Sequence, residues 1–513
     1  MSGTGFDAIV IGSGLGGLVA AGLAARSGRR VLVLEKNQTC GGAAGVYKAG
    51  ELTIESSLHE LDGLDGEDPK LPVLERLEVP AGVRFVELGD LWEVRGPALG
   101  EPFVMPAGLE AAREATAARF PHLRAAVSEY FDRIAELRSA MSLAVRHQRD
   151  PRWWLSRGPR TLWPFVRQQR LTLAHVLERL FGADEAVKQA LCANLIYYAD
   201  DPGRMWFPHW AVAQGSYHRG GGHYPHGGSK QLADHLVRFI QTAGGEVETG
   251  RRVTRILLEG GRVSGVEHAA VGGGERDLRR DRAPLLFGNA APHALAEMLP
   301  GEVRARFMAP FTARPLSLSL WTIALGFTRK PRELGVERYT TAVFPQPLRE
   351  LARGAVLPAE RSNGSSPHYI FVDYSSVDTG LSQGPPYLGT LTGVDRTDNW
   401  DGLSSREYDE RRERFMDTMV AALEREYPRL AGEIIQRQMT TARGAANYLG
   451  TPDGAIYGFS PERRRQVVDG RTRIPGLWLA SAFAGLGGYS GAIIGGSWSA
   501  KAALRESWRD WAS

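Results

Sequence analysis

Apolar and polar positions in the first part of the chain follow a strand–helix–strand pattern. Phe6–Ile11 and Arg30–Leu34 are short and mostly apolar, which is typical of strands buried on both faces. Leu15–Ser27 lies between them and is rich in alanine and leucine, as expected of a buried helix. Together the three segments predict a βαβ unit that starts almost at the first residue.

The pattern changes in the middle of the chain. From about Leu109 to Leu191 the apolar residues recur with helical spacing, and the longest predicted helices are Leu123–His147 and Leu171–Leu191. Leu316–Gly393 is strand-like with many turns, and Ser404–Glu426 is a clear helix. These segments predict a second domain of α+β type that is largely helical.

Glycine-rich turns and strands return after the helical middle. Lys230–Ala243 predicts a helix, and Gly260-Gly261 predicts a hairpin turn. Strands are expected at Glu246–Thr249, Arg252–Glu259, Val263–His268, Pro284–Asn289 and Leu477–Ala480. Each domain is therefore expected to be built from separated pieces, with residues 1–90, 220–300 and 436–513 in the first domain and 91–219 and 301–435 in the second.

Composition excludes several classes of protein. A chain of 513 residues, 43% of them hydrophobic, can form two or more domains with large cores. The net charge of +4 is small and no nucleic-acid-binding motif accompanies it, so no nucleic-acid partner is expected. Two cysteines, Cys40 and Cys192, exclude a disulfide framework and suit a reducing cytoplasm. The charge-free runs Ala8–Ala25 and Gly476–Ala500 are interrupted by glycine, so we expect neither a signal peptide nor a transmembrane helix.

A glycine motif stands between the first strand and the first helix. Gly12 permits a tight turn, Gly14 leaves room for a diphosphate, and Gly17 lets the helix pack close to the strand. The diphosphate would lie on the helix N-terminus, where free N–H groups favour negative charge. Glu35 ends the second strand, where its carboxylate would accept hydrogen bonds from ribose hydroxyls. The motif predicts a dinucleotide site and leaves NAD and FAD both open.

A second glycine pair, Gly41-Gly42, follows the acidic strand end and is followed by Ala43-Ala44. In this segment the chain resembles the flavoprotein family of phytoene desaturases, carotenoid isomerases and retinol saturases, which is related to the amine oxidases. His223–Ser229, Arg252–Ile256, and Gly476–Ala480 with Gly485–Gly496 resemble further segments of that family. Where members commonly have proline before the glycine pair this chain has Cys40, and where many have an acidic residue after the last strand it has Ser481-Ala482.

The resemblance implies that the first domain is a discontinuous Rossmann-type FAD-binding domain and that FAD is the cofactor. No second dinucleotide fingerprint appears, since Gly272–Gly274 has the pattern of a surface turn. The residues expected to bind FAD, from the motif and the resemblance together, are Gly12, Ser13, Gly14, Leu15, Gly16, Gly17, Glu35, Lys36, Gly41, Gly42, Ala43, Ala44, Val253, Asn289, Ala482, Gly487, Gly488 and Tyr489.

Relatives place a short segment beneath the flavin, and here it corresponds to Glu55–Leu61. His59 and Glu60 are therefore candidates for proton transfer, although His59 can equally serve as a structural hydrogen-bonding residue. Tyr224 and His226 lie in a histidine-rich stretch and are further catalytic candidates. That stretch lacks the cysteine or acidic ligands of a familiar metal site, so no metal is expected.

Residues 152–167 interleave tryptophan and phenylalanine with arginine. Such a segment can lie in a membrane interface, or it can form a core or subunit contact. We expect a cytoplasmic protein that contacts the inner face of the membrane peripherally through this segment, and the sequence leaves the oligomeric state open.

The resemblance implies an FAD-dependent oxidoreductase that acts on carbon–carbon bonds of a long apolar polyene or isoprenoid lipid. The direction of the reaction, whether desaturation, saturation or isomerisation, stays open. Two alternatives remain at this point: an amine-oxidase-like enzyme acting on a polar amine, and a flavin-binding protein without turnover. An aromatic cage around the flavin would favour the amine, with candidates Trp206, Phe207, Trp210, Trp321 and Tyr489.

Overall fold

A computed structural model describes residues 5–147, 150–273, 277–355, 366–462, 470–485 and 487–504. Its first domain is built on a five-stranded parallel sheet of order β10-β2-β1-β14-β20. The strands come from three separated parts of the chain: β1 Ala8–Ile11, β2 Val31–Leu34, β10 Glu246–Glu248, β14 Leu286–Gly288 and β20 Leu477–Leu479. The predicted α/β class and the discontinuous Rossmann-type domain are confirmed.

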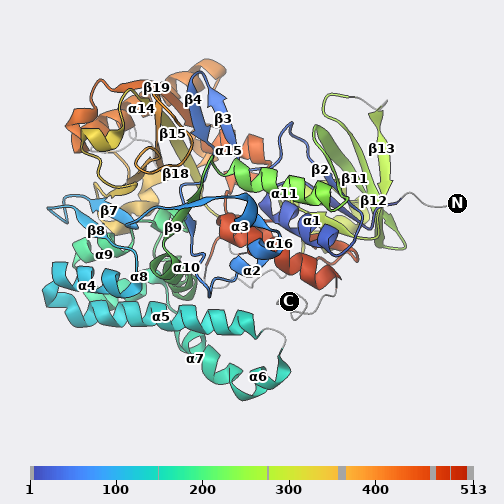
Figure 1. The fold of residues 1–513 in the computed structure, drawn as a ribbon, viewed down its shortest axis with the longest axis horizontal. Coiled ribbons are helices and arrows are strands. Elements are labelled where there is room, and N and C mark those ends of the chain that lie inside the picture. Colours follow the sequence, from blue (N-terminus) through green and yellow to red (C-terminus); the bar gives the residue numbers. More distant parts are fainter. Residues whose placement is uncertain are drawn as a thin grey trace.

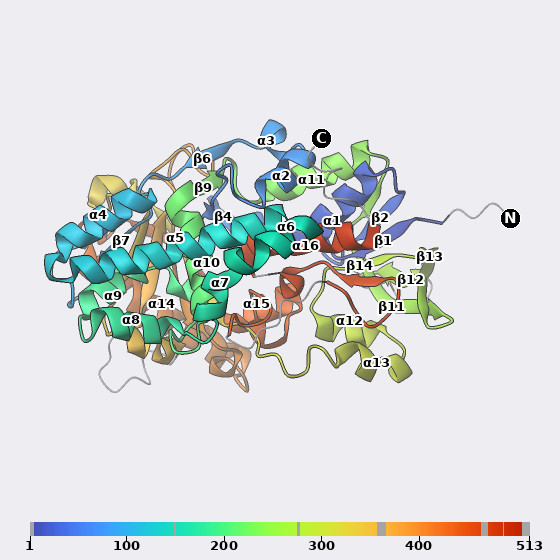
Figure 2. The same ribbon diagram turned by 90° about the horizontal axis from the view of Figure 1, so that it is seen from below.

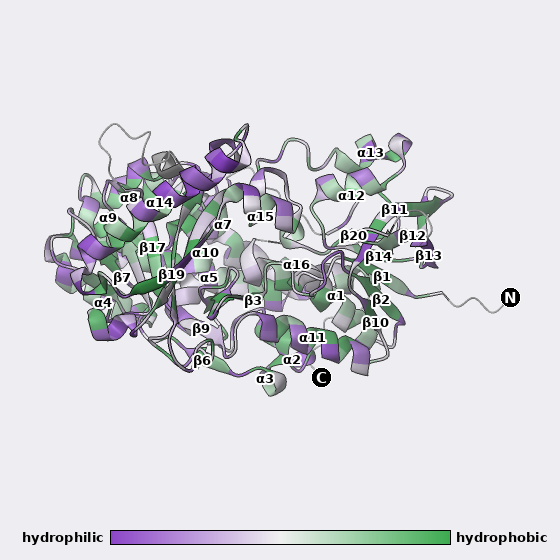
Figure 3. Ribbon diagram, turned by 90° about the horizontal axis from the view of Figure 1, so that it is seen from above, coloured by the Kyte–Doolittle hydropathy of each residue, from purple (hydrophilic) through white to green (hydrophobic). Residues whose placement is uncertain are grey.

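Side chains of β1 and β2 alternate between the two faces of this sheet, and both faces are buried. Val10 and Val33 pack with helices α1 (Leu15–Arg26), α11 (Lys230–Thr242) and α16 (Gly488–Leu504). Ile9 and Leu32 face the opposite core. Strands buried on both sides need continuous apolar runs, which explains the sequence pattern, and Figure 3 shows these strands as hydrophobic.

The opposite face of the sheet is covered by smaller elements. An antiparallel three-stranded sheet is formed by β11 Arg251–Glu259, β12 Arg262–Ala270 and β13 Arg279–Arg282, and the helices are α12 Pro292–Met298 and α13 Gly301–Met308. Figure 2 shows α12 and α13 below the sheet and α1 above it. The predicted hairpin turn at Gly260-Gly261 joins β11 to β12, and both glycines have positive φ.

The second domain combines a seven-stranded sheet with a helical layer (Figure 1). The sheet has the order β19-β15-β18-β17-β16-β7-β8, with β7 Trp92–Arg95, β8 Phe103–Met105, β15 Ser319–Phe327, β16 Thr340–Val343, β17 Tyr369–Asp373, β18 Tyr387–Asp395 and β19 Ile434–Thr440. The principal helices are α4 Leu109–Arg119, α5 Arg124–Arg146, α6 Pro151–Ser156, α7 Gly158–Gln168, α8 Leu173–Phe181, α9 Glu185–Leu191, α10 Phe207–Gly220, α14 Ser405–Glu426 and α15 Ala442–Leu449.

Short elements connect the two domains. They are the hairpin β3 Val46–Ala49 and β4 Leu52–Glu55, the small sheet β5 Leu61–Asp62, β6 Phe85–Glu87 and β9 Gly222–Pro225, and the helices α2 Leu71–Arg76 and α3 Val79–Gly82.

The structure differs from the sequence predictions at two places. The single helix expected over Leu171–Leu191 is wrong, because Gly182 adopts a φ of 55° and Asp184 caps a new helix by accepting a hydrogen bond from the Val187 N–H. The domain boundary placed before residue 436 falls inside β19, which pairs along its whole length with β15. The whole of β19 therefore belongs with the second domain.

Candidate active site

A cavity of about 970 Å³ is lined by residues of both domains. One part of its wall is the glycine loop after β1 together with Gly41-Gly42, and another is the sheet surface of β15, β18 and β19, which contributes Leu320, Thr392 and Met439. The segment that follows β4 lines a third part. The wall of the cavity therefore includes both the glycine motif of the first domain and the sheet of the second.

Close backbone packing holds the glycine loop at the N-terminus of helix α1. A Cβ on Gly17 would lie 2.6 Å from the Gly12 carbonyl oxygen and 2.7 Å from the Asn289 Cβ. The Gly41 N–H donates to the Ser13 carbonyl (3.0 Å), which brings the second glycine pair against the first. Bare backbone therefore forms the wall where a diphosphate needs close approach.

Glu35 fixes this loop. Its Oε2 accepts hydrogen bonds from the Ser13 N–H (2.8 Å) and hydroxyl (2.7 Å), and its Oε1 accepts from the Asn37 N–H (2.8 Å). The carboxylate lines the cavity and keeps further acceptor capacity, since two ionised oxygens offer about four lone-pair sites. Glu35 is thus positioned for the expected ribose contact and also holds the loop itself.

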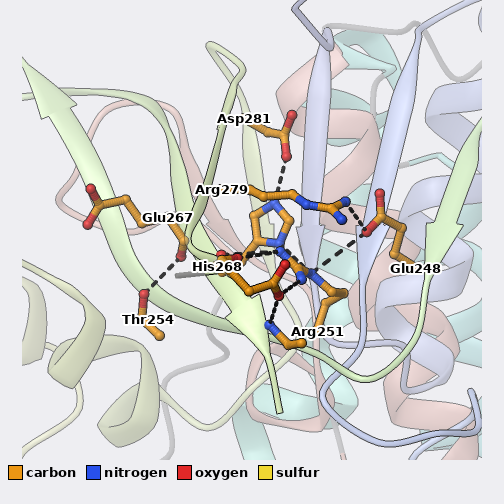
Figure 4. A network of polar contacts seen from close by, with 9 residues as sticks. Glu248, Arg251, Thr254, Glu267, His268, Arg279 and Asp281 are labelled. Atoms are coloured by element: carbon orange, nitrogen blue, oxygen red, sulfur yellow. Dashed lines mark hydrogen bonds and ion pairs between the residues drawn. The ribbon is translucent and has the colours of Figure 1, made fainter. Parts of the chain in front are cut away.

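A polar network supports the backbone next to Glu35 (Figure 4). The Arg251 N–H donates to the Glu35 carbonyl oxygen (2.7 Å), and the Arg251 side chain donates through Nε to His268 Nδ1 (3.1 Å). Because His268 Nδ1 accepts, the proton of the buried ring lies on Nε2, which donates to Asp281 (2.6 Å). The network connects β13 to the end of the cavity lined by Glu35 and Val253.

We predict that Asp281→Ala weakens cofactor binding about tenfold. The substitution leaves the buried His268 N–H without a hydrogen-bond acceptor, and such a loss destabilises the folded state by about 1–3 kcal/mol. Because His268 accepts a hydrogen bond from Arg251, the position of Arg251 becomes less fixed. The measurement is the dissociation constant of the flavin nucleotide by fluorescence titration. Glu259→Ala, which removes a surface ion pair with Arg282, is the matched control and should change nothing; equal affinities of both variants would contradict the prediction.

All but one of the residues expected to bind the cofactor line the cavity. Gly17 is the exception, and it lies behind the loop that it shapes. Tyr489 connects two of the predicted segments, because its hydroxyl contacts the Ala43 carbonyl (3.1 Å) and the Ser57 hydroxyl (3.1 Å). Among the residues that the structure describes, no three histidine, cysteine or acidic side chains gather as metal ligands do.

The segment Glu55–Leu61 is clamped from both domains. The buried Glu55 carboxylate accepts hydrogen bonds from the Tyr224 hydroxyl (2.7 Å) and from the N–H (2.8 Å) and hydroxyl (2.6 Å) of Ser229. Tyr339 and Tyr374 of the second domain donate to the carbonyl oxygens of His59 (2.7 Å) and Leu58 (2.8 Å). These contacts fix the position from which His59 and Glu60 face the cavity.

His59 and Glu60 are both uncharged in this setting. Burial lowers the pKa of the His59 imidazole to about 4, and its Nδ1 is hydrogen-bonded to the Tyr197 hydroxyl (2.7 Å). Burial raises the pKa of Glu60 to about 8; a hydrogen bond with Tyr217 opposes the rise and the nearby Asp62 adds to it. At neutral pH this part of the cavity therefore presents a neutral base and a protonated acid.

The structure separates the four catalytic candidates. His59 and Glu60 line the cavity, whereas Tyr224 and His226 do not. Tyr224 is buried and holds Glu55, and His226 lies near the surface with Nε2 3.4 Å from Asp378. Tyr197 and Tyr217, which touch the two cavity residues, were not predicted, because a tyrosine carries no spacing signal that points to a distant histidine or glutamate.

A family model described as an NAD(P)-binding Rossmann-like domain matches residues 10–71. The chain is 25% identical to the human all-trans-retinol 13,14-reductase over 95% of its own length and 84% of that protein. It is also 25% identical to the prolycopene isomerase of Daucus carota, over 94% of its length and 77% of that protein. Both similarities run over nearly the whole chain and confirm the predicted resemblance to the family of retinol saturases and carotenoid isomerases. The chain is an enzyme with a Rossmann-like dinucleotide-binding domain.

Solved structures agree with this fold. An oxidoreductase from Methanosarcina mazei aligns with a TM-score of 0.61 at 17% identity, covering 97% of this chain and 100% of that one. Putrescine oxidase bound to putrescine aligns with a TM-score of 0.62 at 15% identity, covering 98% of this chain and 99% of that one. At such identities the likeness concerns the fold alone.

Proposed function

We propose that this protein is an FAD-dependent enzyme acting on carbon–carbon double bonds of a long apolar substrate of the polyene or isoprenoid type. The observation that carries the proposal is a pair of neutral groups at the cavity wall: Glu60 keeps its proton, and the His59 ring carries no charge. An unpaired charge facing a hydrocarbon chain would be costly, so a site for a polyene must keep its titratable groups neutral. The names of the retinol and prolycopene relatives support the same substrate class.

The cavity fits FAD along the first domain. The bare glycine walls suit a diphosphate, Glu35 suits a ribose, and Val253 and Met298 offer apolar surface for an adenine. When bound, FAD supplies two-electron hydride chemistry. The residues of this chain position the substrate, exclude water and hold a proton at Glu60.

Apolar side chains also line the cavity. They include Leu58, Leu61, Leu320, Met439 and Ile456. A substrate with few polar groups is recognised by such surface and by the shape of the cavity. His59 serves in this proposal as a neutral hydrogen-bonding residue, held by Tyr197.

The five aromatic residues considered for an amine cage do not come together at the cavity. Of these five, only Tyr489 lines the cavity, while Phe207, Trp210 and Trp321 are buried in the cores. Glu60 is protonated at neutral pH and offers no charge to a cation in the cavity. We therefore prefer the polyene.

The test is the flavin absorbance of the FAD-reconstituted protein, recorded anaerobically with a polyene lipid extract and with putrescine as the amine probe. The proposal expects the lipid to bleach the oxidised flavin or to reoxidise the chemically reduced flavin. Bleaching by the amine alone would establish the amine oxidase. No response to either would favour a flavin-binding protein without turnover, and no flavin band at all would refute FAD as the cofactor.

We further propose that helices α6 and α7 contact an anionic membrane surface on its cytoplasmic side. They lie at the lower edge of Figure 1, with Leu155 85%, Trp163 60% and Val166 48% exposed. Arginines surround these apolar side chains at positions 152, 157, 160, 167 and 170. Exposed aromatic and aliphatic groups with cations beside them match the interface of an anionic bilayer. None of the helices in the described ranges is long and apolar enough to cross a bilayer.

We predict that the triple variant Leu155→Ser, Trp163→Ser, Val166→Ser binds anionic vesicles at least tenfold more weakly. Each apolar side chain that becomes fully buried in the bilayer contributes about 1.5–3 kcal/mol to binding, so even partial insertion of the three accounts for a tenfold difference in affinity. The measurement is co-sedimentation with phosphatidylglycerol vesicles at low salt. Ile435→Ser changes a 60% exposed residue on β19 and is the control; equal binding of wild type and the triple variant would refute the contact.

A further inference from the structure

Glu60 lines the cavity and has a buried carboxyl oxygen without a hydrogen-bond partner in the described part of the chain. The side chain is 9% exposed, and the oxygen in question is Oε1. Tyr217 of α10 hydrogen-bonds to the carboxyl group. A protonated carboxyl that accepts the tyrosine hydroxyl at one oxygen keeps its own O–H at the other. That O–H lacks an acceptor in the described part of the chain.

Burial and the nearby Asp62 oppose the ionisation of Glu60, whereas the hydrogen bond with Tyr217 favours it. The titratable groups that act on it or feel its charge are one carboxylate and five tyrosines: Asp62 of β5, Tyr197, Tyr198, Tyr217, Tyr339 and Tyr374. Burial raises the pKa of each of these tyrosines, so they stay neutral. The buried cation Lys70 is paired with Asp68 (2.7 Å) and Asp62 (3.7 Å).

His59 does not compete for this role. Its ring is neutral at physiological pH, and Nδ1 is occupied by the Tyr197 hydroxyl. A neutral imidazole is a poor acid toward carbon, whereas a carboxylic acid with a pKa near the working pH is a suitable proton donor. Of the two adjacent residues, only Glu60 carries a proton that it can give up and regain.

We propose that Glu60 is the proton donor to carbon and that the site works in the direction of double-bond reduction. This inference rests on the proposed function. Glu60 gives its proton to one carbon of the double bond while a hydride from the reduced cofactor reaches the other. The π bond is replaced by two C–H bonds, the cofactor is oxidised by two electrons, and Glu60 regains its proton from water. A reduced nicotinamide or a comparable two-electron donor must re-reduce the cofactor.

The first test requires no substrate. Infrared spectra of the oxidised holoenzyme should show the C=O band of a buried carboxylic acid at neutral pH, lost as the pH rises through about 8. Glu60→Gln should lack this band, whereas Glu75→Gln, at an exposed position, should keep it. A titrating band that persists in Glu60→Gln, or no band in the wild type, would overturn the inference even if the proposed function holds.

The second test follows turnover of the chemically reduced holoenzyme with the polyene extract in D₂O. The wild type should incorporate solvent deuterium at each reduced double bond, and its rate should fall as the pH rises through about 8. Glu60→Gln should lose at least 100-fold in rate with FAD still bound, which is the size of a general-acid contribution. Undiminished turnover in Glu60→Gln, or conversion only by the oxidised enzyme, would refute Glu60 as the donor. Failure of the wild type to convert polyene in either redox state would instead refute the proposed function.

Discussion

The Gly17→Ala variant is expected to bind FAD at least 100-fold more weakly than the wild type. The new methyl group would lie 2.6 Å from the Gly12 carbonyl oxygen and 2.7 Å from the Asn289 Cβ, and neither is the far end of a flexible side chain. Relief requires helix α1 to move away from β1, which shifts the N–H groups that face the diphosphate. A 100-fold loss corresponds to about 2.8 kcal/mol. The measurement is the dissociation constant of FAD, from apoprotein titrated with the cofactor.

Gly301→Ala is the matched control for this variant. Gly301 is the first residue of helix α13, which covers one face of the five-stranded sheet. Nothing lies within 4 Å of the added methyl group. Its affinity for FAD should equal that of the wild type. If both variants bind FAD alike, close packing at Gly17 is not what holds the diphosphate site in place.

The second large effect is expected for Glu55→Gln. Three hydrogen bonds from Tyr224 and Ser229 end on this buried carboxylate, and an amide offers only one acceptor oxygen in its place. Hydrogen bonds to a charged group contribute about 1.5–3 kcal/mol each, so we expect the free energy of unfolding to fall by about 3 kcal/mol. Turnover should also fall about 100-fold, because the segment that carries His59 and Glu60 loses its anchor.

Urea unfolding of the holoenzyme and steady-state turnover measure the two consequences separately. Glu51→Gln provides the control, because it is an exposed residue in the turn between β3 and β4. We expect no change in that variant. A Glu55→Gln protein with wild-type stability and turnover would show that the clamp does not depend on the carboxylate.

The parts of the fold that sequence reasoning found are those with a local signal. The strand and helix of the first βαβ unit are buried on all sides, so their apolar runs were unambiguous. The order of the seven-stranded sheet was not predictable, because β7 pairs with β16 across a long stretch of chain and no local pattern records that choice. The break at Gly182 was missed because Leu171–Leu191 keeps a helical apolar spacing on both sides of it.

The candidate site divides in the same way. The glycine motif and Glu35 are local in sequence and were found from spacing alone. The segment with His59 and Glu60 came from the resemblance to the family. Tyr197, whose hydroxyl touches His59, lies 138 positions further along the chain. The charge states of His59 and Glu60 could not be predicted from the sequence either, because they depend on burial by both domains.

The five-stranded sheet has a consequence for the order of events during synthesis. Its edge strand β20 pairs with β14, and Gly496 of α16 packs directly against Gly16 of α1. The first domain can therefore complete its sheet only after β20 and α16 have been synthesised. The second domain emerges from the ribosome before that, while the sheet of the first domain still lacks the edge strand β20. A chain that ends before β20 and α16 is therefore expected not to bind the proposed cofactor. Binding of the cofactor would then indicate that nearly the whole chain has been translated. An enzyme that is truncated within α16 is expected to be colourless.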